Sequence, residues 1–463
     1  MSVTAEREAG VTHRGGRWIE NWEPDNPGFW ESTGRKIANR NLIFSILTEH
    51  IAFSIWSLFS VLVLFMGPKQ GFGYITVGDK FVITSLATAV GSVMRIPYNL
   101  SVARVGGRNW TIISALLLLI PSVWLGFAMH PGTSYGTFLV IAAFVGFGGG
   151  NFASSMTNIN TFYPEDKKGS ALGLNAGGGN LGVAVVQLVG LAVLATAGVT
   201  HPKVLVWIYI PLIVVGAVLA TLFMDNIASV KNDSKGMRHA VKEPHTWVMS
   251  FLYIGTFGSF IGYSFAFGQV LQNQFKLTPV AAAGITFLGP LLGSLSRPVG
   301  GWLSDKIGGA KITGATFVVM ALCAALLIVA AGEKSLPLYD TGFILLFVFS
   351  GVANGSTYKM IPAIFRAKAK IEIASGAEEG AALLHARKLS GAVIGIAAAI
   401  GAFGGVLINI AFRQSFLSSA KSGTPAVIGF LVFYAVCFLV TWAVYLRPAT
   451  ERSSRAALAA AQV

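Results

Sequence analysis

The chain has 463 residues, of which 54% are apolar and only 12% are charged. Soluble globular domains carry about 25% charged residues, so roughly half of the usual solvated surface is missing. The apolar residues come in runs of about 18 to 25, which is the length that spans a bilayer core of about 30 Å. Composition therefore excludes a soluble enzyme, a secreted disulfide scaffold and a free nucleic-acid-binding protein. It predicts an all-α polytopic membrane protein.

Apolar runs between charged or Pro/Gly/Ser-rich breaks predict twelve membrane-spanning helices, arranged as two six-helix bundles. In the first half they cover about residues 42–66, 81–103, 111–130, 136–160, 171–195 and 204–225. In the second half they cover about residues 245–269, 280–303, 312–331, 341–362, 388–411 and 425–446.

Polar segments divide the chain into five parts. Residues 1–41 form a polar N-terminal arm, which holds no apolar core of a cleavable signal peptide. Residues 42–225 form the first bundle, and residues 226–244 form a polar linker. Residues 245–446 form the second bundle, and residues 447–463 form a tail.

The formal net charge of +14 is explained by membrane orientation. With a cytoplasmic N-terminus, 24 of the 34 Lys and Arg residues lie on cytoplasmic segments, 7 on the other face and 3 within helices. This asymmetry follows the positive-inside rule. We expect a multi-pass protein of the cytoplasmic (inner) membrane, with both termini in the cytoplasm, the lipid bilayer as its surroundings and no nucleic-acid partner.

The two cysteines, Cys323 and Cys437, both lie inside apolar runs and have no neighbouring metal-ligand residues. They are typical of small core residues, so neither a disulfide nor a metal site is expected. No nucleophile–base pair is visible, and we expect neither an enzyme nor a bound cofactor.

The two halves contain an internal repeat at an offset of 202 residues. The stretch from Arg95 to Gly107 aligns with the stretch from Arg297 to Gly309, arginine on arginine and glycine pair on glycine pair. Each copy closes the second helix of its half. Parallel repeats of this kind are typical of two-bundle secondary transporters, whose substrate site lies near the midplane between the halves.

The second copy resembles the loop signature of the major facilitator superfamily, G-x3-D-[RK]-x-G-[RK]-[RK]. The first copy lacks the acid, because Ala103 stands at that position. The resemblance implies twelve helices in two pseudo-symmetric six-helix bundles. The residues that match are Gly301, Asp305, Lys306 and Gly308, with Lys311 at the basic end.

Arg95 and Arg297 lie deep inside predicted helices, where an ionisable side chain is costly and marks a functional site. Because guanidinium groups keep their protons and Glu49 is the one acid predicted in a helix interior, the cavity is expected to be positive. A planar fork of donors suits a flat oxyanion, and nitrate and nitrite fit this description. The alternative is that each arginine only pairs with backbone carbonyl groups or with a distant acid.

A glycine-rich run, Leu174-NAGGGNLG-Val183, has two compatible interpretations. Small residues at i and i+4 let transmembrane helices pack closely, which explains most of these glycines. Alternatively, they expose backbone near a ligand and let the helix bend during gating, with Asn175 and Asn180 as polar handles.

Several segments together resemble the nitrate/nitrite porter family of this superfamily, the NarK type. They begin at Asn151, Gly169, Phe257, Gly355 and Gly401, and the N-terminal segment Trp22-EPDNPGFW belongs with them. The resemblance implies that one arginine from each of helices 2 and 8 binds the anion. It also implies glycine signatures on helices 5 and 11 and aromatic walls on helices 4 and 7. The expected binding residues are Arg95, Arg297, Asn180, Phe147, Tyr253, Phe257, Gly177 and Gly404.

The mode of coupling stays open between nitrate/nitrite exchange and proton symport. Glu49 and His50 in helix 1, together with Lys359 in helix 10, are candidate proton-handling groups, because the pKa of a buried group depends on its environment. The alternatives are a structural pairing for Glu49 and His50, and a Lys359 that extends toward the interface. We expect a monomer that transports nitrate and nitrite by alternating access. The alternative is a facilitator-type transporter of another small anion, such as a carboxylate or phosphate.

Overall fold

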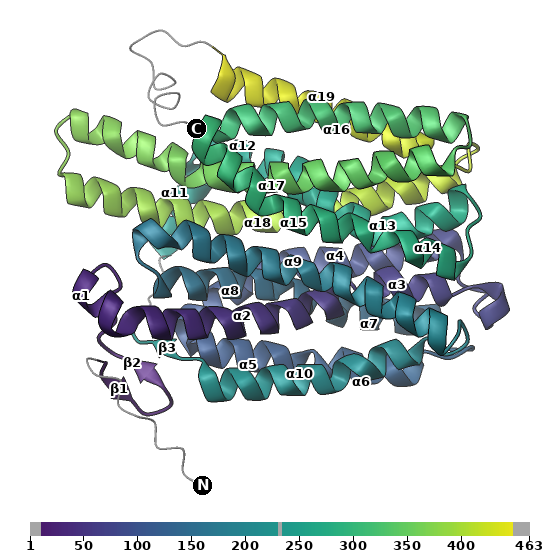
Figure 1. Ribbon diagram of the computed structural model, residues 1–463, viewed down its shortest axis with the longest axis horizontal. Coiled ribbons are helices and arrows are strands. Elements are labelled where there is room, and N and C mark those ends of the chain that lie inside the picture. Colours follow the sequence, from purple (N-terminus) through teal and green to yellow (C-terminus); the bar gives the residue numbers. More distant parts are fainter. Residues whose placement is uncertain (1–10, 230–233, 448–463) are drawn as a thin grey trace.

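The computed structural model describes residues 11–229 and 234–447. Within these residues, twelve helices are long and apolar enough to cross a membrane. They run side by side along the long axis, with the first-half helices (purple to teal) on one side and the second-half helices (green to yellow) on the other (Figure 1). The predicted all-α architecture is therefore confirmed. We call the end where Pro27 and Leu446 lie the terminal end, and the other the far end.

The first half contains six of these spans, and three of them are interrupted at a single residue. The elements are α1 (Pro27–Phe29), the π-helical turn η1 (Trp30–Gly34), α2 (Arg35–Trp56), α3 (Leu58–Phe65), η2 (Pro68–Gln70), α4 (Val77–Val105), α5 (Gly107–Leu117), α6 (Leu119–Ala128), α7 (Tyr135–Val145), α8 (Phe147–Phe162), α9 (Glu165–Thr196) and α10 (Lys203–Phe223).

The second half contains the other six, after a short helix that lies in the linker. The elements are α11 (Ser234–Lys242), α12 (Pro244–Tyr253), the π-helical turn η3 (Ile254–Gly258), α13 (Ser259–Gln274), α14 (Pro279–Thr286), α15 (Leu288–Ile307), α16 (Gly309–Gly332), α17 (Leu336–Ala374), α18 (Glu379–Leu417), α19 (Thr424–Thr441) and η4 (Trp442–Leu446).

The first helix starts well before the expected residue 42, so the segment 1–41 is not a polar arm throughout. Asn26 caps α1, its side chain accepting hydrogen bonds from the N–H groups of Gly28 and Phe29, and Pro27 occupies the first helical turn. Hydropathy misses this start because Arg35, Lys36 and Arg40 interrupt the apolar pattern. The tail at 447–463 lies, after Arg447, outside the described residues.

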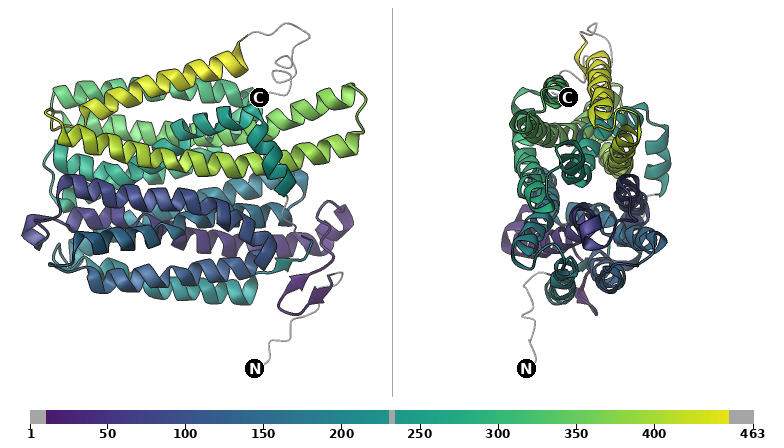
Figure 2. Two further views of the ribbon diagram at one scale, coloured as in Figure 1. Left: turned by 180° about the vertical axis from the view of Figure 1, so that it is seen from behind. Right: turned by 90° about the vertical axis from the view of Figure 1, so that its right-hand side faces the viewer.

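Two helices of the second half are longer than predicted. α17 and α18 each have 39 residues, which at 1.5 Å per residue exceeds a bilayer core of about 30 Å nearly twofold. Their surplus forms a helical hairpin that projects at the terminal end (Figure 2). Hydropathy does not reveal these extensions because their polar residues fall outside the apolar windows.

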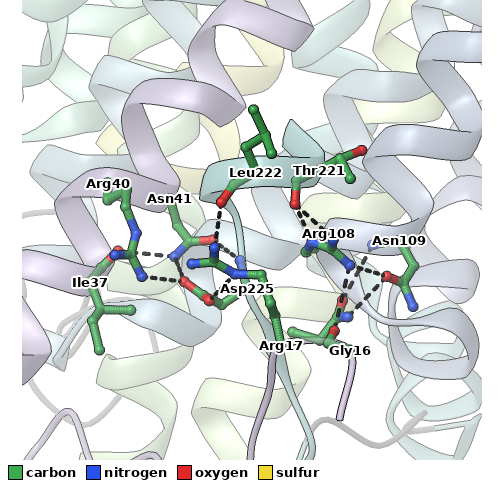
Figure 3. Close-up of polar contacts among 11 residues, drawn as sticks. Gly16, Arg17, Ile37, Arg40, Asn41, Arg108, Asn109, Thr221, Leu222 and Asp225 are labelled. Atoms are coloured by element: carbon green, nitrogen blue, oxygen red, sulfur yellow. Dashed lines mark hydrogen bonds and ion pairs between the residues drawn. The ribbon is translucent and has the colours of Figure 1, made fainter. Parts of the chain in front are cut away.

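A three-stranded sheet attaches the N-terminal segment to the first bundle. β1 (His13–Arg14) pairs antiparallel with β2 (Trp18–Ile19), and β2 pairs in parallel with β3 (Asn226–Ile227). Beside it the fully buried Asp225 carboxylate accepts hydrogen bonds from Arg17 (2.9 Å), Arg40 (2.8 Å) and Asn41 (2.9 Å) (Figure 3). Asp225 therefore joins the N-terminal segment, α2 and the end of α10.

The two bundles are hydrogen-bonded to each other toward the far end by neutral side chains. Contacts of this kind connect α4 with α18, α9 with α13, and α13 with α3. We call this set the far-end latch. Its bonds are Thr84 to Asn409 (3.0 Å), Gln187 to the Ser264 carbonyl (2.9 Å) and Gln272 to the Leu64 carbonyl (3.3 Å).

Candidate anion-binding site

Arg95 of α4 and Arg297 of α15 are both buried, with exposures of 1% and 4%. Their guanidinium carbons lie 4.6 Å and 5.9 Å from the centre of one aromatic ring, that of Phe152 on α8. The structure therefore brings the two repeat-related arginines to the same place between the bundles. Each precedes a proline inside its helix, Pro97 in α4 and Pro298 in α15.

Further aromatic rings surround the guanidinium groups. Phe257 lies 4.8 Å from the Arg95 guanidinium carbon, and Tyr358 lies 5.6 Å from that of Arg297. The Tyr253 hydroxyl accepts a hydrogen bond of 3.4 Å from Arg297. The faces of aromatic rings attract cations, so this enclosure stabilises two positive charges without neutralising them.

The π-helical turn η3 places the aromatic residues of helix 7. Tyr253 and Phe257 stack with ring centroids 5.4 Å apart, as their spacing of four residues predicts. Tyr253 fits because Gly401 has no side chain: a Cβ there would lie 2.3 Å from the tyrosine ring. Such π-helical turns occur frequently at functional sites.

Three of the six guanidinium nitrogens of this pair are buried without an acceptor among the described residues. Arg95 Nη1 donates to the Ala398 carbonyl on α18 at 3.0 Å, but its Nε and Nη2 are buried without a partner. Arg297 Nη1 is also buried without one. Among residues 11–229 and 234–447, no carboxylate forms an ion pair with either arginine. Because buried unpaired donors are costly, the site is suited to bind an anion that accepts these hydrogen bonds.

The buried Glu49 carboxylate interacts electrostatically with both arginines. It accepts hydrogen bonds from Ser155 on α8 (2.5 Å) and from Asn175 on α9 (2.8 Å). Glu49 thus contacts neighbouring helices while remaining close enough to affect the charge of the site.

The glycines of the run on α9 differ in their surroundings. Cβ atoms at Gly178, Gly179 and Gly182 would overlap with Ile46, the Glu49 carboxylate and the His50 carbonyl, so these glycines allow close packing against α2. Gly177 instead faces open space. Asn180 on the same helix is buried, and its Oδ1 has no partner.

The remaining residues predicted for the site make other contacts within the bundles. Phe147 contacts Phe144 (5.4 Å), and Phe152 is the α8 ring that contacts the arginines. Gly404 packs directly against Gly258 of η3. His50 Nδ1 is 3.1 Å from the Gly178 carbonyl oxygen.

Lys359 forms an ion pair with Asp305, the acid of the loop signature (2.6 Å). Lys359 lies inside α17, well before this helix ends at Ala374, and its side chain is partly exposed, whereas Glu49 is buried. Elsewhere in the described part of the chain, no group of three or more His, Cys, Asp or Glu residues could hold a metal ion.

Comparison with known proteins decides the family. Residues 44–377 match the profile of the Major Facilitator Superfamily. The chain belongs to the Major Facilitator Superfamily. It is 40% identical over 452 residues to the nitrate/nitrite transporter NarU of Salmonella typhimurium and to NarU of Escherichia coli, covering 93% of this chain and 96% of each relative. It is 32% identical to the probable nitrate/nitrite antiporter NarK2 of Thermus thermophilus, covering 94% and 98%.

Two solved transporter structures have a similar fold. The D-xylose–proton symporter matches with a TM-score of 0.65 at 13% identity, covering 88% of this chain and 96% of that one. A bacterial homologue of the lysosomal transporter Spinster, in an inward-facing and occupied conformation, matches with a TM-score of 0.61 at 16% identity, covering 87% and 95%. The relatives are transporters, which confirms the prediction of a transporter and not an enzyme.

Proposed function

We propose that this chain is a secondary active transporter that takes up nitrate and extrudes nitrite across the cytoplasmic membrane. It acts as a monomer by alternating access, with both termini in the cytoplasm. The observation that carries this proposal is the burial of Arg95 and Arg297 around one Phe152 ring with N–H groups left unpaired. The relatives, which are named for nitrate and nitrite, support the choice of anion.

The anion completes the hydrogen bonding of the site. A planar oxyanion offers several acceptor lone pairs to the two forked guanidinium groups, which bind such groups with defined geometry. The rings of Phe152 and Phe257 flank Arg95, so an anion bound to this guanidinium would lie beside aromatic side chains. In the empty site two like charges repel each other, so a bound anion lowers the cost of rearranging the two bundles.

Alternating access requires that one end of the interface opens as the other closes. The far-end latch holds the bundles together on one side of the arginines, while Gly177 faces open space. We infer that the anion enters and leaves at the terminal end in this conformation, and that breaking the latch exposes the site to the far end.

Coupling either exchanges nitrate for nitrite or uses protons. The exchange mode needs only the arginine pair, because the bundles reorient with an anion bound. Proton symport needs a titratable group near the anion, and Glu49 meets this requirement through its position near both arginines. Its burial and its two hydrogen bonds make Glu49 a better candidate than the partly exposed Lys359.

The arginine clamp is tested by uptake of isotope-labelled nitrate into proteoliposomes. Arg95→Lys and Arg297→Lys keep the charge but lose the planar fork, so we expect uptake to fall to background in each. Arg35→Lys is the matched control, because Arg35 pairs with Glu31 at the exposed start of α2. Wild-type uptake in both clamp variants would refute the proposal.

A transporter of another small anion is the second candidate, since a positive aromatic site also admits carboxylate or phosphate. Competition distinguishes the two. If nitrite inhibits labelled nitrate uptake while formate and phosphate at equal concentration do not, the substrate is nitrate and nitrite. Stronger inhibition by formate or phosphate would assign the site to that anion class.

A further inference from the structure

An apolar groove of about 480 Å³ lies between α18 and α19, separate from the arginine site. Its walls include Leu407 and Ala411 on α18 and Gly429 and Phe433 on α19, and its floor reaches Ile254. None of its lining residues within the described chain is charged. Volumes of about 300–1,000 Å³ are typical of sites that enclose small molecules.

The polar atoms of the groove lie in two places. Near the floor, the Ser259 hydroxyl is hydrogen-bonded to Tyr434 (2.8 Å) and so needs no external partner. At the far end of α18, Gln414 and Ser418 line the groove beside the start of α19. The groove thus has an apolar body and a polar rim at one end.

The surroundings of the groove determine what fills it. Both walls belong to candidate membrane spans, and α19 exposes large apolar side chains, among them Ile428 (49%), Val432 (55%) and Leu439 (56%). In a membrane protein such surfaces contact lipid chains. We propose that an acyl chain of a bilayer phospholipid occupies this groove as a retained ligand, with its headgroup at the polar rim.

The acyl chain would contact the π-helical turn η3, on the side that faces away from the arginines. Ile254 begins η3, and Gly404 lines the same groove while packing on Gly258. The other face of this turn presents Tyr253 and Phe257 to the arginines. The lipid would therefore pack against the side of this turn that faces away from the anion site and would hold Tyr253 and Phe257 in position. This step rests on the proposed function.

The test fills the groove and measures lipid retention. A Cβ at Gly429 meets nothing within 4 Å, and Gly429 lines the groove, so Gly429→Phe directs a ring into the groove space. Val432→Phe, on the same helix but outside the groove lining, is the matched control. Protein purified in mild detergent is analysed by native mass spectrometry. We expect one phospholipid on the wild type and on Val432→Phe, and at least a tenfold loss in Gly429→Phe, about 1.4 kcal/mol in binding free energy.

A second measurement locates the lipid independently of retention. Wild-type protein in vesicles of phosphatidylethanolamine and phosphatidylglycerol containing a diazirine-bearing phospholipid is photolabelled and mapped by peptide mass spectrometry. Labelling concentrated on the groove residues of α18 and α19, and lost in Gly429→Phe, supports the proposal. Equal labelling of all lipid-facing helices, or unchanged retention in Gly429→Phe, overturns it. Neither measurement uses transport, so failure here is distinguishable from failure of the proposed function.

Discussion

The Glu49 carboxylate accepts a hydrogen bond of 2.8 Å from the side-chain amide of Asn175. This bond joins α2 to the glycine-rich part of α9, and Ser155 adds a connection to α8. Because Glu49 lies within electrostatic range of Arg95 and Arg297, a proton on Glu49 and an anion at the proposed site would act on the same positive charge. The Glu49 side chain therefore contributes both to the packing of three helices and to the electrostatics of the proposed anion site.

Replacing Glu49 with Gln tests whether this carboxyl carries a proton. The amide preserves size and hydrogen bonding but cannot ionise. We expect nitrate uptake driven by an imposed proton gradient, without internal nitrite, to fall to background, while exchange into nitrite-loaded vesicles persists. Glu31→Gln, at the exposed terminal end, is the control and should leave both components intact. An equal loss of both components in Glu49→Gln would assign Glu49 a structural role.

A methyl group should lower stability at Gly179 and leave it unchanged at Gly177, although both glycines lie in the same run on α9. In Gly179→Ala the Cβ would lie 2.3 Å from Glu49 Oε1, whereas in Gly177→Ala it would enter open space. Overpacking of this kind costs about 1–3 kcal/mol. We expect Gly179→Ala to lower both the melting temperature in detergent and nitrate uptake, and Gly177→Ala to change neither stability nor folding. Equal melting temperatures would contradict the close packing of α9 on α2.

Phe152 should contribute to anion affinity, and Phe147 should not. Removing the ring in Phe152→Ala deletes a contact shared by both arginines, and such cation–π contacts are worth about 0.5–2 kcal/mol. We expect the KM for nitrate to rise roughly 2- to 30-fold. Phe147→Ala is the matched control, because that ring contacts Phe144 on the same span. A larger rise in KM for Phe147→Ala would reverse the assignment.

Asp225 should be important for stability and not for substrate affinity. Asp225→Asn removes the charge that Arg17 and Arg40 contact. Breaking a fully buried ion pair costs about 3–5 kcal/mol, and the partial exposure of these arginines reduces that value. We expect a lower melting temperature with an unchanged KM. Asp79→Asn, at the capping box of α4, should cost only about 1 kcal/mol. Equal effects of the two variants would contradict the special role of Asp225.

The sequence predicted the architecture because bilayer thickness restricts span length, and it predicted the arginine pair because the internal repeat marks equivalent positions. It did not distinguish Phe147 from Phe152, since both lie on the same predicted span and only the packed structure shows which ring reaches the arginines. Tyr358 was missed for the same reason. The hydrogen bond from Asn175 to Glu49 depends on contact between distant helices. The one indication of this bond in the sequence is that Asn175 lies in the glycine-rich run.

The far-end latch has an electrical consequence. One of its bonds joins a hydroxyl to a side-chain amide, and the other two join side-chain amides to backbone carbonyls. Opening the latch therefore moves no ionised latch group through the transmembrane potential. Each elementary charge that does move across the membrane is worth about 2.3 kcal/mol per 100 mV. Opening the latch should therefore add no voltage dependence of its own to the transport rate.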